Sequence, residues 1–148
     1  MTSAFDTNVL VYAVEKSDSS RKARAMDLLA RAMRGGSTIL LLQTLGEFSN
    51  VLLRRQIAVR SIEQALSAWR AIFTVEPALP GDIDAALAAV RAHKLSFWDA
   101  MLWASAERLG VQHLLCEDLQ DGRKLGNVRF LNPFNPANAA IVDRILPS

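Results

Sequence analysis

Short apolar runs alternate along this chain with longer segments of helical periodicity, and this alternation limits the folds open to it. The apolar runs span residues 3–6, 38–42, 74–76, 113–116 and 128–131. Runs of this length, bounded by turn residues, are typical of buried strands. Because helices separate the strands, the pattern predicts an α/β fold with a central, mainly parallel sheet covered by helices on both faces.

Helices are predicted from apolar stripes and from start and stop signals. Residues 21–34 carry apolar side chains at i, i+3, i+4, i+7 and i+8, and a glycine pair follows them. Residues 61–64 match a capping box and predict a helix that ends near Phe73. Further helices are expected at residues 9–14, 44–55, 82–93, 96–109 and 137–145.

The length of 148 residues fits a single domain, 1–148, with residues 133–148 as a C-terminal tail or short helix. No apolar run approaches the roughly 20 residues needed to cross a bilayer, so we expect no membrane contact. The N-terminus lacks a basic start followed by an apolar block, which argues against a signal peptide. A cytoplasmic protein is the expectation.

The cysteine and histidine content limits the kinds of metal site. Cys116 is the only cysteine, and His93 and His113 are the only histidines. No intrachain disulfide, thiolate cluster or histidine-rich zinc site is therefore expected. A bound metal would be held by oxygen, which points to Mg²⁺ or Mn²⁺.

Four carboxylates stand at comparable places along the predicted fold. Asp6 ends the first strand, and Asp118 follows the strand that closes at Cys116. Glu47 and Asp99 each lie three residues after a Thr or Ser that could start a helix. In a parallel sheet the strand ends and the following helix starts share one edge, so these acids are expected to converge.

Gathered acids repel one another unless protons or cations neutralise them, and divalent cations are the simpler answer. Two such ions about 4 Å apart can activate a water, grip a phosphodiester and stabilise the leaving oxygen. The sequence contains no glycine-rich phosphate loop and no GxSxG elbow, which argues against other phosphate or acyl chemistry.

Each acid also has a purely structural interpretation. Residues 44–47 and 96–99 match a capping box, in which Glu47 and Asp99 would only cap helices. Asp118 and Asp121 lie in a stretch of ordinary turn composition. Asp6 is hardest to explain in this way, because a carboxylate at the end of an apolar strand is costly unless something binds it.

Basic residues concentrate in the first half, where residues 1–75 carry ten basic and six acidic side chains. One predicted helix carries five of them, Arg21, Lys22, Arg24, Arg31 and Arg34, and a second is followed by Arg54, Arg55 and Arg60. They form either a solvated helix face or a contact surface for a phosphate backbone. Trp98 and Trp103 are expected in the core rather than against nucleic acid.

The acidic segments resemble, in order, the four motifs of PIN-domain proteins, with VapC-type toxins the closest match. They span residues 5–10, 45–48, 97–100 and 114–122, and the likeness extends to residues 132–134. The resemblance implies a compact three-layer α/β/α sandwich and a Mg²⁺- or Mn²⁺-dependent endoribonuclease, the toxin of a toxin–antitoxin pair. RNA is then the expected substrate.

The same resemblance assigns roles to residues. The metal-binding and catalytic carboxylates would be Asp6, Glu47, Asp99 and Asp118, with Asp121 as an outer contributor. Asn8 would orient Asp6 or the site water through its amide, and Thr7 would support the turn. Cys116 departs from the family, which often has Ser or Thr there, because a thiol is a poor hydrogen-bonding group.

The resemblance also implies partners. Such toxins are usually homodimers, silenced by a small antitoxin protein whose C-terminal segment lies in a groove near the active site. The apolar surfaces of helices 9–14 and 44–55 are expected to serve those contacts. Two alternatives remain open: a PIN-like module that binds protein or RNA without cutting it, and a metal-dependent nuclease acting on flapped or single-stranded DNA.

Overall fold

The computed structural model describes residues 1–148. The strands are β1 (Ser3–Phe5), β2 (Thr38–Leu41), β3 (Thr74–Glu76), β4 (His113–Leu115), β5 (Lys124–Leu125) and β6 (Val128–Leu131). The helices are α1 (Thr7–Ala13), α2 (Ser20–Gly35), α3 (Leu42–Arg54), α4 (Val59–Arg70), α5 (Pro80–Ala92), α6 (Phe97–Arg108) and α7 (Ala139–Ile145), with one 3₁₀ turn at Pro136–Asn138.

The strands form a single six-stranded sheet in the order β3-β2-β1-β4-β6-β5. Every neighbouring pair is parallel except β5 and β6, which are antiparallel. The predicted α/β fold with a mainly parallel sheet is confirmed. The two-residue strand β5 was not predicted.

Alternating side chains along the strands separate two apolar layers. One face of the sheet contributes Phe5, Leu40, Leu115 and Leu131 to a core shared with α1–α4 and α7. The other face contributes Ala4, Leu41, Leu114 and Phe130, which pack with residues of α6. Because neighbouring residues of a strand point to opposite faces, both faces of these strands are apolar and both need helices.

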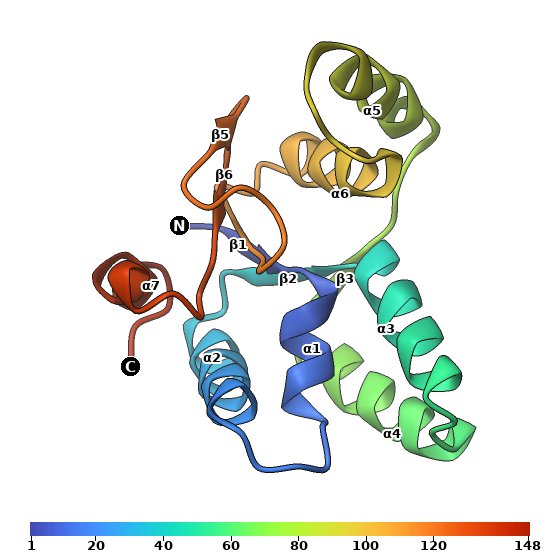
Figure 1. The fold of residues 1–148 in the computed structure, drawn as a ribbon, viewed down its shortest axis with the longest axis vertical. Coiled ribbons are helices and arrows are strands. Elements are labelled where there is room, and N and C mark those ends of the chain that lie inside the picture. The colour runs from blue at the N-terminus through green and yellow to red at the C-terminus, as the bar shows by residue number, and fades with distance from the viewer.

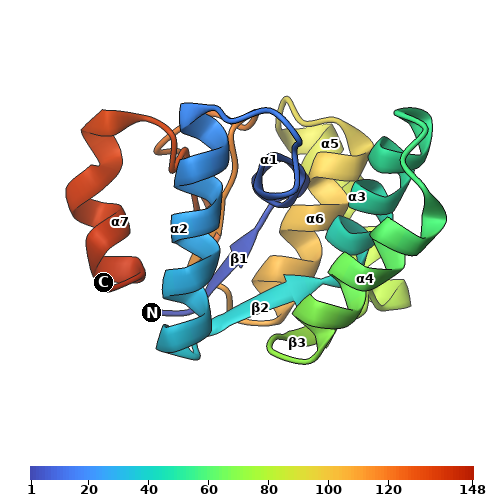
Figure 2. The ribbon, with the colours of Figure 1, turned by 90° about the horizontal axis from the view of Figure 1, so that it is seen from below.

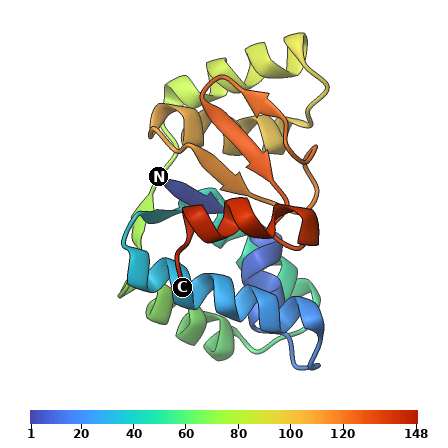
Figure 3. The same cartoon turned by 90° about the vertical axis from the view of Figure 1, so that its left-hand side faces the viewer.

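The helices accordingly cover the sheet from two sides (Figure 1). α1, α2, α3 and α4 lie on one side, while α6 lies on the other with α5 packed outside it. Figures 2 and 3 show α7 beside α2, where Arg31 of α2 forms an ion pair with Asp143 of α7. None of the helices combines the length and hydropathy of a transmembrane segment.

The order of the strands places a switch point beside β1. The chain leaves β1 for β2 on one side, and after β3 it returns to form β4 on the other side of β1. In open α/β sheets, ligands bind outside the carboxyl ends of the strands at such a point. Asp6 directly follows β1 at this edge.

Helices α1, α3, α4 and α5 each begin two residues earlier than predicted, and in α3 and α4 this moves the predicted cap into the helix. α3 starts at Leu42 and α4 at Val59, so Thr44 and Ser61 lie inside the helices and do not cap them. Thr44 is fully buried, and its hydroxyl donates to the Phe5 carbonyl oxygen at 3.2 Å. This bond ties the start of α3 to the end of β1.

One expectation about exposure is wrong. Trp98 is not in the core, since its exposed fraction is 62%, whereas Trp103 is half-buried and donates to the Leu125 carbonyl oxygen. The apolar surface expected on residues 9–14 is mostly buried, because Val9, Leu10 and Val11 lie in the core, while Val14 is exposed. On α3, only Leu42 and Leu53 are exposed apolar residues.

Candidate active site

Asp6 is held between the end of β1 and the start of α1. Its backbone N–H donates to the Leu115 carbonyl oxygen at 2.9 Å, which continues the pairing of β1 with β4. Its carboxylate Oδ1 accepts from the Thr7 N–H at 2.7 Å, as an N-cap does. A neutral Asn or Ser could make the same cap, so helix capping alone does not require a charge here.

Glu47 lies in the second turn of α3 and is fixed from two sides. Its Oε2 accepts from the Thr7 hydroxyl at 2.9 Å, and its Oε1 accepts from Gln43 Nε2 at 2.7 Å. Because α3 begins at Leu42, Glu47 is too far into the helix to act as its cap. Thr7 therefore links two of the predicted acids, Asp6 through its N–H and Glu47 through its hydroxyl.

Asp99 stands in the first turn of α6. Its backbone N–H donates to the hydroxyl of Ser96, which is the N-cap of this helix. The Asp99 carboxylate itself forms no hydrogen bond within the protein. Gln43 Nε2 also donates to the Trp98 carbonyl oxygen at 2.9 Å, which fixes the start of α6 against the start of α3.

Asp118 follows β4 and is held by α1. Its Oδ2 accepts from Asn8 Nδ2 at 2.7 Å, so the contact expected between Asn8 and Asp6 is replaced by one with Asp118. One turn further along α1, the Tyr12 hydroxyl donates to Glu117 at 2.7 Å. Two successive hydrogen bonds thus hold the loop after β4 against α1.

These four segments meet at one cavity of about 270 Å³. Its lining consists of Asp6, Thr7, Asn8, Glu47, Asn50, Val51, Asp99 and Asp118. The predicted convergence of Asp6, Glu47, Asp99 and Asp118 is therefore present in the structure. Thr7 and Asn8 lie there as well.

The electrostatics of the cavity are unfavourable for Asp6. Burial raises its pKa to about 6, the hydrogen bond from Thr7 opposes this, and the charges of the three neighbouring acids raise it further. The exposed fraction of Asp6 is only 8%. At neutral pH the buried charge therefore lacks a compensating cation within the protein.

The donor set fits a hard divalent cation, because the four acids offer only oxygen ligands and Asp6 retains an oxygen, Oδ2, without a hydrogen bond. No three acidic, histidine or cysteine side chains are close enough to form a preassembled metal centre. Hydrogen bonds from Thr7, Asn8 and Gln43 fix the carboxylates of Asp6, Glu47 and Asp118 instead.

Asp121 does not line this cavity. Its two oxygens accept from the Asn132 N–H and from the side-chain amides of Asn135 and Asn138, each at 2.9 Å. These donors lower its pKa against the opposing effect of burial. Asp121 thus fixes the segment between β6 and α7, a contact that the turn composition did not reveal.

Cys116 is fully buried and belongs to the apolar core beneath the site. Its thiol lies 3.5 Å from the Leu114 carbonyl oxygen and forms no hydrogen bond with any of the four acids. Burial, followed by the nearby charge of Asp6, raises its pKa well above the usual range. The thiol is neutral and packs as a small apolar side chain.

Gln43, Asn50 and Val51 were missed as site residues. They lie four residues before, three after and four after Glu47, and side chains at these spacings share one face of a helix. The position of Glu47 could therefore have identified them, once the start of α3 was placed correctly.

The predicted basic surface on α2 is largely used within the protein. Arg21 pairs with Glu117, Arg24 with Asp27, and Arg31 with Asp27 and Asp143. Intramolecular ion pairs thus engage three of the five basic side chains, which favours the structural interpretation for this helix.

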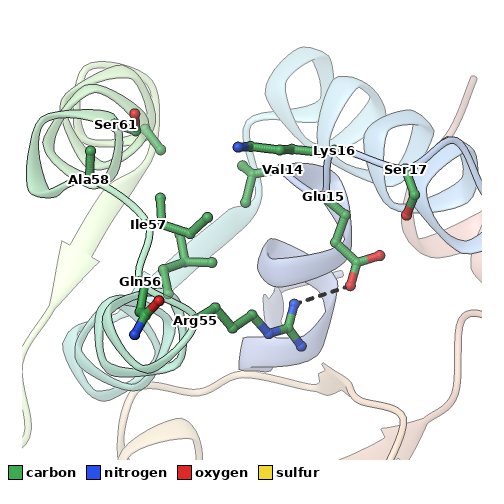
Figure 4. A pocket seen from close by; sticks show the side chains of 11 residues that line it. Val14, Glu15, Lys16, Ser17, Arg55, Gln56, Ile57, Ala58 and Ser61 are labelled. Atoms are coloured by element: carbon green, nitrogen blue, oxygen red, sulfur yellow. Dashed lines mark hydrogen bonds and ion pairs between the residues drawn. The ribbon is translucent and has the colours of Figure 1, made fainter.

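A second, larger cavity of about 820 Å³ lies between the end of α1 and the turn that joins α3 to α4 (Figure 4). Its apolar lining includes Leu52, Ile57 and Ala65. Arg55 bridges it by an ion pair with Glu15 at 3.3 Å.

Solved structures share this fold, although no protein with a curated function matches the sequence. VapC20 of Mycobacterium tuberculosis, a sarcin–ricin loop cleaving toxin, superposes with a TM-score of 0.67 at 22% identity, covering 79% of this chain and 90% of that one. A chain from a toxin–antitoxin complex of Klebsiella pneumoniae gives 0.64 at 18% identity, covering 90% and 99%. At these identities the likeness shows the fold.

The sequence itself matches a family over most of its length. Residues 4–120 match the PIN domain, and this range contains all four acids of the cavity. The strand order and the two helical layers agree with the three-layer sandwich expected from the motifs. This chain belongs to the PIN-domain family.

Proposed function

We propose that the protein is a Mg²⁺- or Mn²⁺-dependent endoribonuclease and the toxin of a toxin–antitoxin pair. The observation that carries the proposal is the cavity in which Asp6, Glu47, Asp99 and Asp118 meet from four separate segments of the chain. Membership of the PIN-domain family and the fold shared with an RNA-cleaving toxin support it.

The four acids would hold the metal. A bound divalent ion would supply positive charge for the phosphodiester and lower the pKa of an attacking water. The chain's own part is to keep the acids in place: Thr7 holds Asp6 and Glu47, Asn8 holds Asp118, and Gln43 joins Glu47 to the start of α6. In hydrolysis the water oxygen bonds to phosphorus, the bond to one ribose oxygen breaks, and that oxygen takes up a proton.

Cleavage by an Asp6→Asn variant tests this proposal. The substitution keeps the shape and a capping oxygen but removes the buried charge, so the rate of RNA cleavage with Mn²⁺ should fall at least about 100-fold. Asp84→Asn is the matched control, because Asp84 is exposed on α5 and lies outside the cavity. Equal cleavage by wild type and Asp6→Asn would contradict the assignment.

The two alternatives give different results in related measurements. A binding module that does not cut RNA would bind no metal through these carboxylates, which calorimetric titration with Mn²⁺ would detect. A DNA nuclease would cut a single-stranded DNA oligonucleotide faster than the RNA of the same sequence. The proposed ribonuclease should bind Mn²⁺ and prefer the RNA.

The second cavity supports an antitoxin partner. Its lining combines the apolar side chains of Leu52, Ile57 and Ala65 with the basic side chains of Lys16 and Arg55. Figure 4 shows Ile57, Lys16 and Arg55 around this cavity. Such a lining suits a protein segment with apolar and acidic side chains. A short reading frame next to this gene would supply the partner to examine.

A homodimer is part of the same proposal. The outer face of α5 exposes Ile83, Leu87 and Val90, which are spaced four and three residues apart and form one apolar stripe. A stripe of this kind without a covering element supports a contact with a second copy of the chain. Molar mass in solution tests it.

A further inference from the structure

Trp98 is a large apolar side chain that is exposed to solvent next to the cavity lined by the four acids. Its exposed fraction is 62%, whereas that of Trp69 is 9%, and Trp103 is half-buried with its indole N–H bonded to the Leu125 carbonyl oxygen. Asp99, the next residue along the chain, lines the cavity. An exposed tryptophan in this position suggests a ligand with an aromatic face.

Two contacts fix Trp98 at the start of α6. Its carbonyl oxygen accepts from the same Gln43 amide group that donates to Glu47. The Phe97 ring contacts the indole edge-on, with 5.1 Å between the ring centroids and 69° between the planes. The Trp98 backbone is thus fixed relative to the acids, near the N-terminal end of α3.

An arginine without an ion pair, Arg54, lies at the C-terminal end of α3. Arg54 follows Glu47 by seven residues, so it projects within about 20° of the same direction, roughly 10 Å further along the helix. Asn50 and Val51, which lie between them, line the cavity. Arg54 is exposed and forms no ion pair, unlike its neighbour Arg55, which pairs with Glu15.

We propose that a single strand of RNA lies along α3, with an unpaired base stacked on Trp98, a backbone phosphate bound by Arg54, and the scissile phosphate at the acids between them. This inference rests on the proposed function and adds the form of the substrate. Proteins commonly bind single strands by base stacking on aromatic rings and by basic groups along the backbone. In a duplex the base faces are covered, so Trp98 specifies an unpaired nucleotide.

Binding to a catalytically silenced protein tests the inference directly. In an Asp6→Asn background, the anisotropy of a fluorescein-labelled unstructured RNA 10-mer is followed at several salt concentrations. Adding Trp98→Ala should weaken binding about 5- to 150-fold, while Trp98→Phe should retain most of the affinity. A duplex of the same sequence should bind with an affinity that Trp98→Ala does not change.

Arg54 is tested in the same assay by the salt dependence of binding. Arg54→Ala should reduce the slope of log K against log salt by about 0.7, the share of one phosphate contact. Arg70→Ala is the matched control, since Arg70 is also exposed, unpaired and in the last turn of its helix, α4. Its slope should equal that of the parent protein.

Several results would overturn the inference. One is an equal salt-dependence slope for Arg54→Ala and Arg70→Ala. Another is an unchanged RNA affinity of Trp98→Ala. If Trp98→Ala also changed the molar mass in solution at unchanged affinity, the indole would belong to an interface between copies. Cleavage of the same RNA by proteins that retain Asp6 is measured in parallel. If the wild type cleaves the RNA and both Trp98→Ala and Arg54→Ala bind it normally, only this inference is removed. If the wild type does not cleave the RNA, the proposed function is removed as well.

Discussion

Two aspartates of this protein are almost fully buried, yet their surroundings are opposite. Asp82, 3% exposed, accepts two hydrogen bonds from the Arg108 guanidinium at 2.8 and 3.0 Å, together with bonds from the Leu79 N–H and the Ser105 hydroxyl. Asp6 is 8% exposed, and its carboxylate accepts one hydrogen bond and has three acidic neighbours.

Their pKa values move in opposite directions for this reason. Burial alone would raise both, but the donors around Asp82 lower its pKa, whereas the pKa of Asp6 rises to about 6. Asp82 is neutralised within the fold and pins α5 to α6. Asp6 lacks such a partner, so it is the group that the proposed cation would neutralise.

The largest loss of stability is expected when Arg108, the internal partner of Asp82, is removed. Arg108→Ala would leave Asp82 buried and unpaired, which should lower the free energy of unfolding by about 3–5 kcal/mol. Urea denaturation measures it, with Arg91→Ala as the control because Arg91 is exposed on α5 and forms no ion pair. A loss no greater than in the control would mean that Arg108 does not neutralise Asp82.

The pH dependence of stability sharpens the contrast for Asp6. Its folded pKa of about 6 lies above the ordinary value of 3.8, so the folded state binds the proton more tightly than the unfolded state. Its contribution to stability is therefore greatest in acid and should fall by about 2–3 kcal/mol as the pH rises from about 4 to 7 without metal.

The free energy of unfolding is measured against pH for the wild type and for Asp6→Asn. The difference between the two curves isolates the contribution of Asp6, because the other acids titrate in both proteins. Above about pH 7 the metal-free variant should be the more stable of the two. If the two curves of unfolding free energy against pH were parallel, the charge of Asp6 would not destabilise the fold.

A smaller effect is expected from the groups that position the acids. Gln43→Leu removes the amide that joins Glu47 to the Trp98 carbonyl oxygen, and should weaken Mn²⁺ binding about 10-fold. Ser49→Ala is the control on α3, since the Ser49 hydroxyl bonds only to the Leu45 carbonyl oxygen of the same helix. Calorimetric affinities that do not differ between these variants would remove Gln43 from the site.

The sequence predicted most of the fold because its signals were local or periodic. β3 and β6 have the predicted bounds, and the apolar strands with their intervening helices determined the sheet. The convergence of the four acids followed from one geometric rule, that parallel strands end at a common edge.

The remaining errors arose where a distant partner decides the outcome. Thr44 matched a capping box, but its hydroxyl binds the Phe5 carbonyl oxygen, 39 residues away in sequence. Asp82 and Arg108 are paired only because α5 packs on α6, which no local pattern reveals. Trp98 is exposed because it lies in the first turn of α6, whereas the middle of that helix is buried between the sheet and α5.

We propose that the acids around Asp6 oppose one another until a divalent cation binds them. Thermal unfolding of the wild type and Asp6→Asn at pH 7.5, titrated with Mn²⁺, tests it most directly. Asp6→Asn should start with the higher Tm and barely respond to Mn²⁺, while the Tm of the wild type should rise with Mn²⁺ concentration. An equal response of both proteins, or none in the wild type, would contradict it.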